Sequence, residues 1–239
     1  MRFELLERDG LARIGVLEID DTEHATPTIA FVDTPRYPAL PKALKLKGIW
    51  NSEKGSLVVA PSEFVAEGAK PGSKTHLWPG FRGSQYAEVA DKSEFAVPKN
   101  ISTLLLDSKK FADAVRRMKQ GADLLRPAYC PVAGLPHRLA FLVYCGFDVF
   151  DSIPLIMATE NDTYLTSSGV LAYERMKELP CSCPSCSSGR RSREELLRHN
   201  CAIAENELKL VRHAISEGRL RELVEARIRP DPWLVQNLR

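Results

Sequence analysis

Four side chains of metal-binding type cluster near the end of the sequence. A C-x-C-x-x-C run is followed thirteen residues later by a histidine, and the four residues are Cys181, Cys183, Cys186 and His199. Three thiolates and one imidazole complete the tetrahedral shell of Zn²⁺ and leave no position for a substrate. The spacing therefore predicts a closed, structural zinc site that fixes a local fold and performs no chemistry itself.

The composition is that of a globular chain. Its 239 residues are 44% hydrophobic, which allows one sizeable core with a small appendage. The net charge of +2 does not by itself indicate a nucleic-acid partner, although the region from residue 181 onward carries 11 basic and 8 acidic residues. That region either meets phosphates or is a solvated charged surface, and the counts leave both open.

The sequence shows neither a secretion signal nor a membrane span. The first residues lack the apolar centre of a signal peptide, and no apolar run approaches the roughly 18 residues that cross a bilayer. We therefore expect a cytoplasmic protein with reduced thiols and no membrane partner. Cys130 and Cys145 lie in apolar segments and are expected to be core residues.

The expected elements begin with β structure. Residues 3–7 and 12–19 flank Asp9-Gly10, a dipeptide typical of a tight hairpin turn. Residues 28–32 and 56–60 are further strand candidates, and residues 68–95 are expected to be loop.

The middle of the chain alternates between segments with the apolar pattern of a strand and segments with that of a helix. Strands are expected at residues 102–106, 124–130 and 147–150, and helices at 108–120 and 135–145. This order predicts parallel β-α-β units.

Two helices are expected after the cysteine run. The first starts at a capping box of Ser192 and Glu195 and ends at Gly218, and the second covers residues 220–228. An apolar stripe from Leu208 to Ile215 follows one face of the first helix. The stripe either packs on the core or forms a docking surface.

Two motifs resemble those of the tRNA-guanine transglycosylase family, especially its archaeal, archaeosine-forming branch. The first is Gly134-Leu-Pro followed by the run G-F-D-V-F-D-S, which ends at Ser152. The second is the cysteine run with its preceding Tyr164-Leu-Thr and following L-R-H-N segments. The run R-D-G-L-A-R-I-G that ends at Gly15 is also similar to the opening hairpin of that family.

The resemblance implies an α/β fold, specifically a trimmed or irregular TIM-type (β/α) barrel with an N-terminal β-hairpin and a C-terminal zinc-binding helical subdomain. Residues 1–179 would form the barrel and residues 180–239 the zinc subdomain. Asp151 would be the catalytic carboxylate at a strand end, and Gly134, His137 and Asp148 would lie at the substrate site. The residues alone favour a helix-capping or loop carboxylate for Asp151, and for His137 they favour a packing role at least as much as substrate contact.

Arginines gather beside the cysteine run and are candidates for RNA contact. A guanidinium fork matches phosphate oxygens, so the group suits a nucleic-acid backbone. The alternative is a solvated loop. The residues are Arg190, Arg191, Arg193 and Arg198.

The chain also departs from the family pattern. The early D-S-G signature is missing from residues 33–99, and Thr159-Glu160 stand where the family carries a basic pair. The stretch before Gly134 is short for several β-α units. These departures make the chain most similar to the related archaeosine synthases, in particular to the N-terminal, transglycosylase-like half of a split form.

Three functions stay open at this level. The first is a synthase subunit that adds lysine to 7-cyano-7-deazaguanine in tRNA, together with a second chain carrying RNA-binding domains. The second is base exchange through Asp151 as nucleophile. The third is a non-catalytic, RNA-binding subunit that forms homo- or hetero-oligomers through the zinc subdomain.

Overall fold

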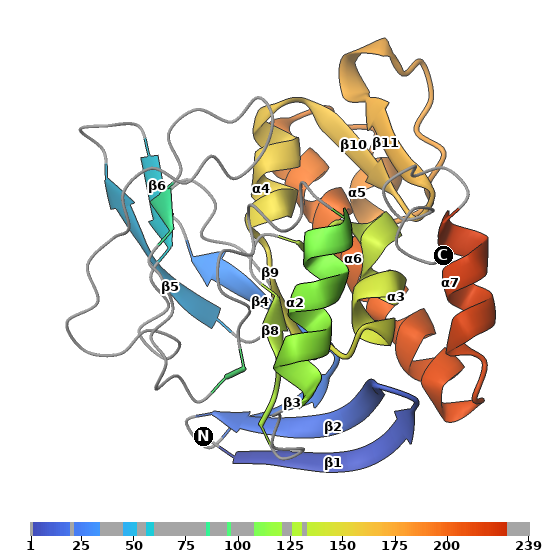
Figure 1. The fold of residues 1–239 in the computed structure, drawn as a ribbon. Coiled ribbons are helices and arrows are strands. Elements are labelled where there is room, and N and C mark those ends of the chain that lie inside the picture. Colours follow the sequence, from blue (N-terminus) through green and yellow to red (C-terminus); the bar gives the residue numbers. More distant parts are fainter. Residues whose placement is uncertain are drawn as a thin grey trace.

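The fold is mixed α/β, as expected, with helices packed beside a partly parallel sheet (Figure 1). The computed structural model describes residues 2–19, 22–33, 45–51, 56–59, 85–86, 95–96, 108–120, 126–130 and 133–228. The strands in these ranges form three sheets.

The largest sheet has six strands in the order β7-β6-β5-β4-β9-β8. They are β4 (Thr28–Asp33), β5 (Lys45–Asn51), β6 (Ser56–Val59), β7 (Gln85–Tyr86), β8 (Tyr129–Cys130) and β9 (Val149–Asp151). Strands β5, β4, β9 and β8 are mutually parallel, so their carboxyl ends meet at one edge. Within the described ranges β7 and β8 are the outer strands, and the sheet is open rather than a closed barrel.

A three-stranded antiparallel sheet lies at one end of the molecule (Figure 1). Its strands are β1 (Arg2–Asp9), β2 (Ala12–Ile19) and β3 (Thr22–Thr26). The predicted hairpin is confirmed, and Gly10 adopts a φ of 62°, which suits glycine at this turn. The third strand was not expected from the sequence.

The helices follow the apolar periodicity closely. Helices α2 (Ser108–Gln120) and α7 (Leu220–Ile228) have the predicted bounds, and α3 (Pro136–Tyr144) and α6 (Arg193–Ser216) differ by a residue or two. The predicted side-chain cap is present, because the Ser192 hydroxyl accepts a hydrogen bond from the Glu195 backbone. The remaining elements are α4 (Ile153–Glu160), β10 (Thr163–Thr166), β11 (Gly169–Ala172), the 3₁₀ turn η1 (Tyr173–Arg175) and α5 (Pro184–Ser187).

The strand predictions were less accurate than the helix predictions. Of the predicted strand 124–130, residues 126–130 are described, and within them β8 is the strand. Pro127 has no N–H for a ladder, and Ala128 forms an isolated bridge to Ala96. The short strand β7 lies inside the predicted loop 68–95, most of which is outside the described residues. The predicted strand 102–106 is outside them as well.

Helix α6 buries its apolar stripe in the core of this chain. Leu208, Val211 and Ile215 are at most 3% exposed and belong to the same apolar cluster as α3 and α7. The stripe is therefore a packing surface, and its use for docking a second chain is excluded in this fold. Of the helices that the structure describes, none combines the length and apolar composition that crossing a bilayer requires.

A buried ion pair joins the N-terminal sheet to the start of β9. Arg13 on β2 is 5% exposed, and Asp148, which directly precedes β9, is fully buried. Arg13 Nε donates to Asp148 Oδ1 at 3.1 Å, and Arg13 Nη2 pairs with Asp148 Oδ2. The Ala128 backbone N–H also donates to Oδ2, at 2.7 Å. The buried charge of Asp148 is thus balanced by Arg13, which lies 135 residues earlier in the sequence.

Removing Arg13 should be strongly destabilising. Arg13→Ala leaves a buried carboxylate without its counter-charge, which typically costs about 3–5 kcal/mol. Denaturant unfolding of the variant and the parent chain measures this loss.

The matched control is Arg2→Ala on the neighbouring strand. Arg2 lies 3.9 Å from Glu4 in an exposed pair, where the loss should stay below about 1 kcal/mol. Equal free energies of unfolding for the two variants would contradict the structural role of the Arg13–Asp148 pair.

Candidate functional site

Asp151 is the last residue of β9 and lies at the carboxyl edge of the parallel strands, where active sites of α/β folds form. Its carboxylate is fully buried and both oxygens accept hydrogen bonds. The Tyr129 hydroxyl donates to Oδ2 at 2.7 Å, and the Ile153 backbone N–H donates to Oδ1 at 3.0 Å. These two donors fix the orientation of the carboxylate.

The two contacts differ in what they imply. The bond from Ile153, the first residue of α4, is the local turn that a helix-start carboxylate makes. The bond from Tyr129 comes from the neighbouring strand β8, and capping a helix does not require it. The carboxylate is thus held from two directions, and an orientation fixed in this way suits a base or nucleophile as well as a helix start.

Gly134 lies against the end of β9. A Cβ atom at this position would be 2.9 Å from the backbone oxygen of Asp151 and 3.4 Å from Phe150 Cβ, so only glycine allows this approach. Pro136 then starts α3, where its lack of an N–H costs nothing. The first turn of α3 carries His137, which is 6% exposed.

The residues predicted for the substrate site therefore separate into two groups. Gly134 and Asp151 meet, and His137 lies three residues beyond Gly134 in the sequence. Asp148 lies just before β9, whereas Asp151 is the last residue of β9. Both carboxylate oxygens of Asp148 bind to Arg13, and one of them also accepts from the backbone of Ala128. These contacts favour a structural role for Asp148 in place of the expected substrate contact.

Tyr129 was missed by the sequence analysis. The expected strand 124–130 includes it without a role of its own, although its hydroxyl donates to the candidate catalytic carboxylate. The sequence did contain a sign of this contact. Tyr129 lies near the end of one expected parallel strand, and Asp151 lies near the end of another. Parallel neighbours end at the same edge, so polar groups at their ends come together.

The four predicted metal ligands form one compact group. The thiol sulfurs and the imidazole donor all lie within 4.8 Å of one another. The Nδ1 atom of His199 is 3.5 Å from Cys183 Sγ and 3.3 Å from Cys186 Sγ. Cys183 is the N-cap residue of α5, which carries Cys186, and α6 supplies His199. The group can hold a single metal ion.

The surroundings of His199 favour metal binding by its imidazole ring. Its Nε2 atom is 2.9 Å from the carbonyl oxygen of Leu165, so Nε2–H donates and the Nδ1 lone pair faces the sulfurs. Burial lowers the pKa of His199, partly offset by that carbonyl, which favours the neutral imidazole that metals bind. Burial raises the pKa of the Cys186 thiol to about 12, so its proton must leave when a metal binds.

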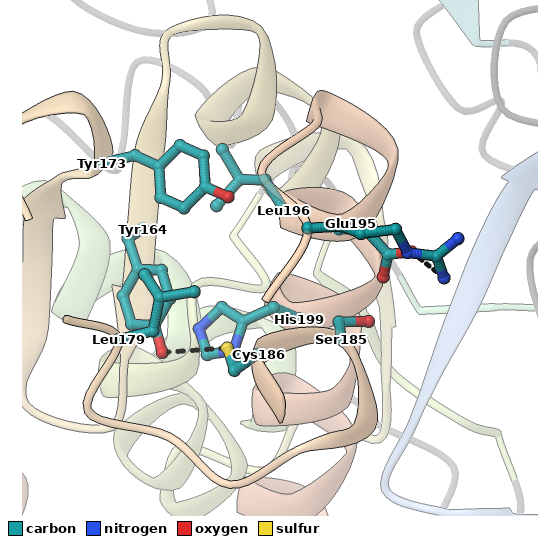
Figure 2. Close-up of a pocket in the computed structure, with 9 residues that line it drawn as sticks. Tyr164, Tyr173, Leu179, Ser185, Cys186, Glu195, Leu196 and His199 are labelled. Atoms are coloured by element: carbon teal, nitrogen blue, oxygen red, sulfur yellow. Dashed lines mark hydrogen bonds and ion pairs between the residues drawn. The ribbon is translucent and has the colours of Figure 1, made fainter. Parts of the chain in front are cut away.

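Aromatic rings enclose the metal-ligand group on one side. Figure 2 shows Tyr164 between Tyr173 and His199, beside Cys186. The Tyr164 and His199 rings are stacked, with centroids 3.8 Å apart, and the Tyr164 hydroxyl is 3.3 Å from Cys186 Sγ. The rings therefore belong to the support of the ligand group.

The four arginines predicted for RNA contact are all at the surface but have different partners. Arg190 pairs with Glu195 at 2.9 Å, Arg193 with Asp162 at 3.0 Å, and Arg198 with Glu194 at 2.6 Å. A guanidinium already paired with a carboxylate has less to gain from a phosphate.

Arg191 differs from the other three. It donates to the backbone carbonyls of Met176 and Lys177, and its guanidinium lies 5.7 Å from the centre of the Tyr173 ring. In the described part of the chain its charge is not paired with a carboxylate. Of the four, Arg191 has the contacts best suited to an incoming phosphate.

Comparison with known proteins identifies relatives that carry named activities. A tRNA-guanine(15) transglycosylase of Methanosarcina mazei is 33% identical over 186 residues, which cover 70% of this chain and 38% of that protein. The enzyme of the same name from Methanocaldococcus jannaschii is 37% identical over 182 residues, 66% of this chain and 28% of that protein.

A third relative aligns along nearly the whole chain. The archaeosine synthase subunit alpha of Methanosarcina acetivorans is 28% identical over 282 aligned positions, which cover 99% of this chain and 44% of that protein. The chain thus spans less than half the length of each of these relatives.

The family profile described as Queuine tRNA-ribosyltransferase matches residues 84–232, more than half of the chain. The matched region contains the Asp151 strand, the metal-ligand group and helix α6. The resemblance expected from the two motifs is confirmed, and this chain belongs to the queuine tRNA-ribosyltransferase family.

Proposed function

We propose that this chain modifies tRNA in the archaeosine pathway, as the transglycosylase-like subunit of an archaeosine synthase that adds lysine to 7-cyano-7-deazaguanine. The alignment of 99% of the chain with an archaeosine synthase subunit alpha supports this choice. The observation that carries it is the Asp151 carboxylate, which Tyr129 and Ile153 orient at the carboxyl edge of the sheet. The proposed class is a tRNA-modifying transferase.

In this proposal Asp151 holds and deprotonates the lysine amine. The ammonium proton passes to the carboxylate, and the freed amine nitrogen bonds to the nitrile carbon as one π bond of the nitrile opens. The carboxyl then returns its proton to the nitrile nitrogen, which leaves a protonated amidine and a regenerated carboxylate. Tyr129 and the Ile153 N–H keep the two oxygens in place during the transfer. Gly134 and His137 remain the proposed substrate contacts beside it.

Base exchange is the second candidate, and the transglycosylase names of the 33% and 37% identical relatives favour it. Here an Asp151 oxygen bonds to the ribose anomeric carbon while guanine leaves, and 7-cyano-7-deazaguanine then displaces Asp151. The absence of a D-S-G run from residues 33–99 opposes it, because that run would supply a second acid beside the base. A non-catalytic RNA-binding subunit is the third candidate.

Zinc is the proposed metal. With Zn–S bonds of about 2.3 Å and Zn–N bonds of about 2.0–2.1 Å, tetrahedral angles place sulfur and nitrogen about 3.6 Å apart. The 3.5 Å and 3.3 Å separations in the Cys₃His group come close to this value. All four ligands come from the protein, so zinc would stabilise the fold and leave the chemistry to other residues.

The proposed architecture follows the family. Residues 1–179 would form a trimmed barrel, of which the open sheet is the described part, and residues 180–239 the zinc subdomain. Helix α6 belongs to the second unit by sequence, although its apolar face packs on α3.

The proposed partners are tRNA and a second chain with RNA-binding domains, and tRNA as substrate makes the cytoplasm the proposed location. Arg191 is the proposed phosphate contact, with Arg190, Arg193 and Arg198 able to join it after exchanging partners. Any homo- or hetero-oligomer through the zinc subdomain would use the solvent side of α6, where Leu210 is 49% exposed.

The decisive assay incubates tRNA bearing 7-cyano-7-deazaguanine with labelled lysine and this chain, with and without a candidate partner chain. Lysine transfer detected by mass spectrometry is the expected result, and Asp151→Asn should abolish it while the far-UV spectrum is retained. Displacement of labelled guanine from unmodified tRNA, without lysine transfer, would establish base exchange instead.

The control for Asp151→Asn is Asp113→Asn on α2, where the carboxylate is exposed and pairs with Arg116. This variant should keep full activity. Retained lysine transfer by Asp151→Asn would rule out a direct chemical role of that carboxylate.

Tyr129→Phe should lower kcat while KM changes little. The substitution removes the O–H that orients Asp151 Oδ2 and keeps the buried ring. The expected loss is about 10- to 100-fold, less than the roughly 10²- to 10⁴-fold of losing a proton-transfer group itself. Steady-state kinetics measure it. Tyr144→Phe at the end of α3 is the matched control, and equal kcat values for the two variants would contradict the assignment.

Cys183→Ser should lose metal and lower the melting temperature, because the ligand group ties α5 to α6. Metal analysis of the purified chain should give about one zinc per chain for the parent, and a chelator should reproduce the loss of stability. Cys145→Ser, a cysteine outside the group, is the control. A metal-free chain that melts at the parent temperature would exclude a structural metal.

A further inference from the structure

Asn200, the residue after the metal-ligand histidine, is fully buried and uses its whole side chain. Its Oδ1 atom accepts from the Leu165 backbone N–H at 3.0 Å. Its Nδ2 atom donates to Thr159 Oγ1 and to the Thr163 carbonyl, both at 3.1 Å. The orientation of the amide is determined, because a backbone N–H must meet the oxygen and a carbonyl must meet the nitrogen.

His199 and Asn200 hold the same residue of β10. The Leu165 N–H donates to Asn200, and the Leu165 carbonyl accepts from His199 Nε2 at 2.9 Å. Both backbone groups of Leu165 are therefore engaged by two consecutive side chains of α6. The orientation of the metal-ligand imidazole and the position of Asn200 depend on each other through this residue.

The contact between Asn200 and Thr159 extends this network to Asp151. Thr159 is in the last turn of α4, and its hydroxyl also donates to the Leu155 carbonyl at 2.9 Å, within the helix. The first residue of α4, Ile153, donates its N–H to Asp151 Oδ1. Because α4 is a rigid helix of eight residues, holding its last turn also holds the donor at its first.

We propose that Asn200 is a positioning residue that couples the metal-ligand group to the Asp151 carboxylate. It acts through Thr159 and α4, and it does not touch the substrate. The inference rests on the proposed function in one respect only, namely that Asp151 is the reacting carboxylate. The coupling between Asn200, α4 and the metal-ligand group is a property of the folded chain and is measurable without a substrate.

The central test variant is Thr159→Val, which removes the hydroxyl link and leaves every bond of His199, Leu165 and the Asn200 oxygen in place. We expect kcat for lysine transfer to fall about tenfold, the lower end of the usual loss on removing an outer-shell partner. KM and metal content should be unchanged. Hydrogen–deuterium exchange of peptides covering α4 should become faster.

Thr163→Val is the matched control. It is the same substitution in the adjacent strand β10, and the lost hydroxyl donates to the Asn161 carbonyl outside the network. The control should retain parental kcat and parental exchange in α4. If Thr159→Val behaves like the control in both measurements, the positioning role is overturned.

A second pair of measurements tests the coupling itself. Asn200→Ala combined with Thr159→Val should lower kcat no further than Asn200→Ala alone, because both remove the same link. Chelation of the metal should accelerate exchange in α4 of the parent chain, and it should do so much less in Thr159→Val. Additive losses, or equal acceleration in both chains, would contradict the proposal.

The exchange measurements also separate this inference from the proposed function. If the parent chain neither transfers lysine nor exchanges guanine, the proposed function fails. The response of α4 to metal removal and to Thr159→Val then still decides whether Asn200 couples the two regions.

Discussion

The structure depends on the burial of two carboxylates at the two ends of one three-residue strand. A buried charge is costly unless it is paired and hydrogen-bonded, so each end of β9 must be supplied with donors. At Asp148 the donors come from β2 and the Ala128 backbone, and at Asp151 from β8 and α4. A structural ion pair therefore lies just before β9, and the carboxylate that we propose to react lies at its end.

Helix α6 serves two regions with two sets of side chains. Its apolar stripe packs into the core with α3 and α7, while His199 and Asn200 contact β10 and the end of α4. A single rigid element thus fixes the distance between the metal-ligand group and the carboxyl edge of the sheet. A metal bound by all four side chains of the Cys₃His group would offer no position to substrate, and it would act by supporting this helix.

Local patterns predicted the helices α2, α3, α6 and α7 and the grouping of the Cys₃His side chains well, and the long-range contacts poorly. The Asp9-Gly10 turn, the helix periodicities and the C-x-C-x-x-C spacing each depend on residues close together in sequence. The roles of Arg13 and Tyr129 depend on which strands become neighbours, which a single sequence does not determine. Asp148 illustrates the limit, because its motif suggested a substrate contact while its partner lies 135 residues away. The barrel expected from the resemblance also depends on strand closure, and the described strands form an open sheet.

The separation between Arg13 and Asp148 has a consequence for how the chain folds. The N-terminal hairpin forms from local contacts, but its arginine meets its counter-ion only after 135 further residues exist. At a synthesis rate of about 5–20 residues per second, the hairpin waits roughly ten seconds with that charge in water. Its docking is therefore a late step, and its contacts with α6 and α7, which span 209 and 211 residues, form later still.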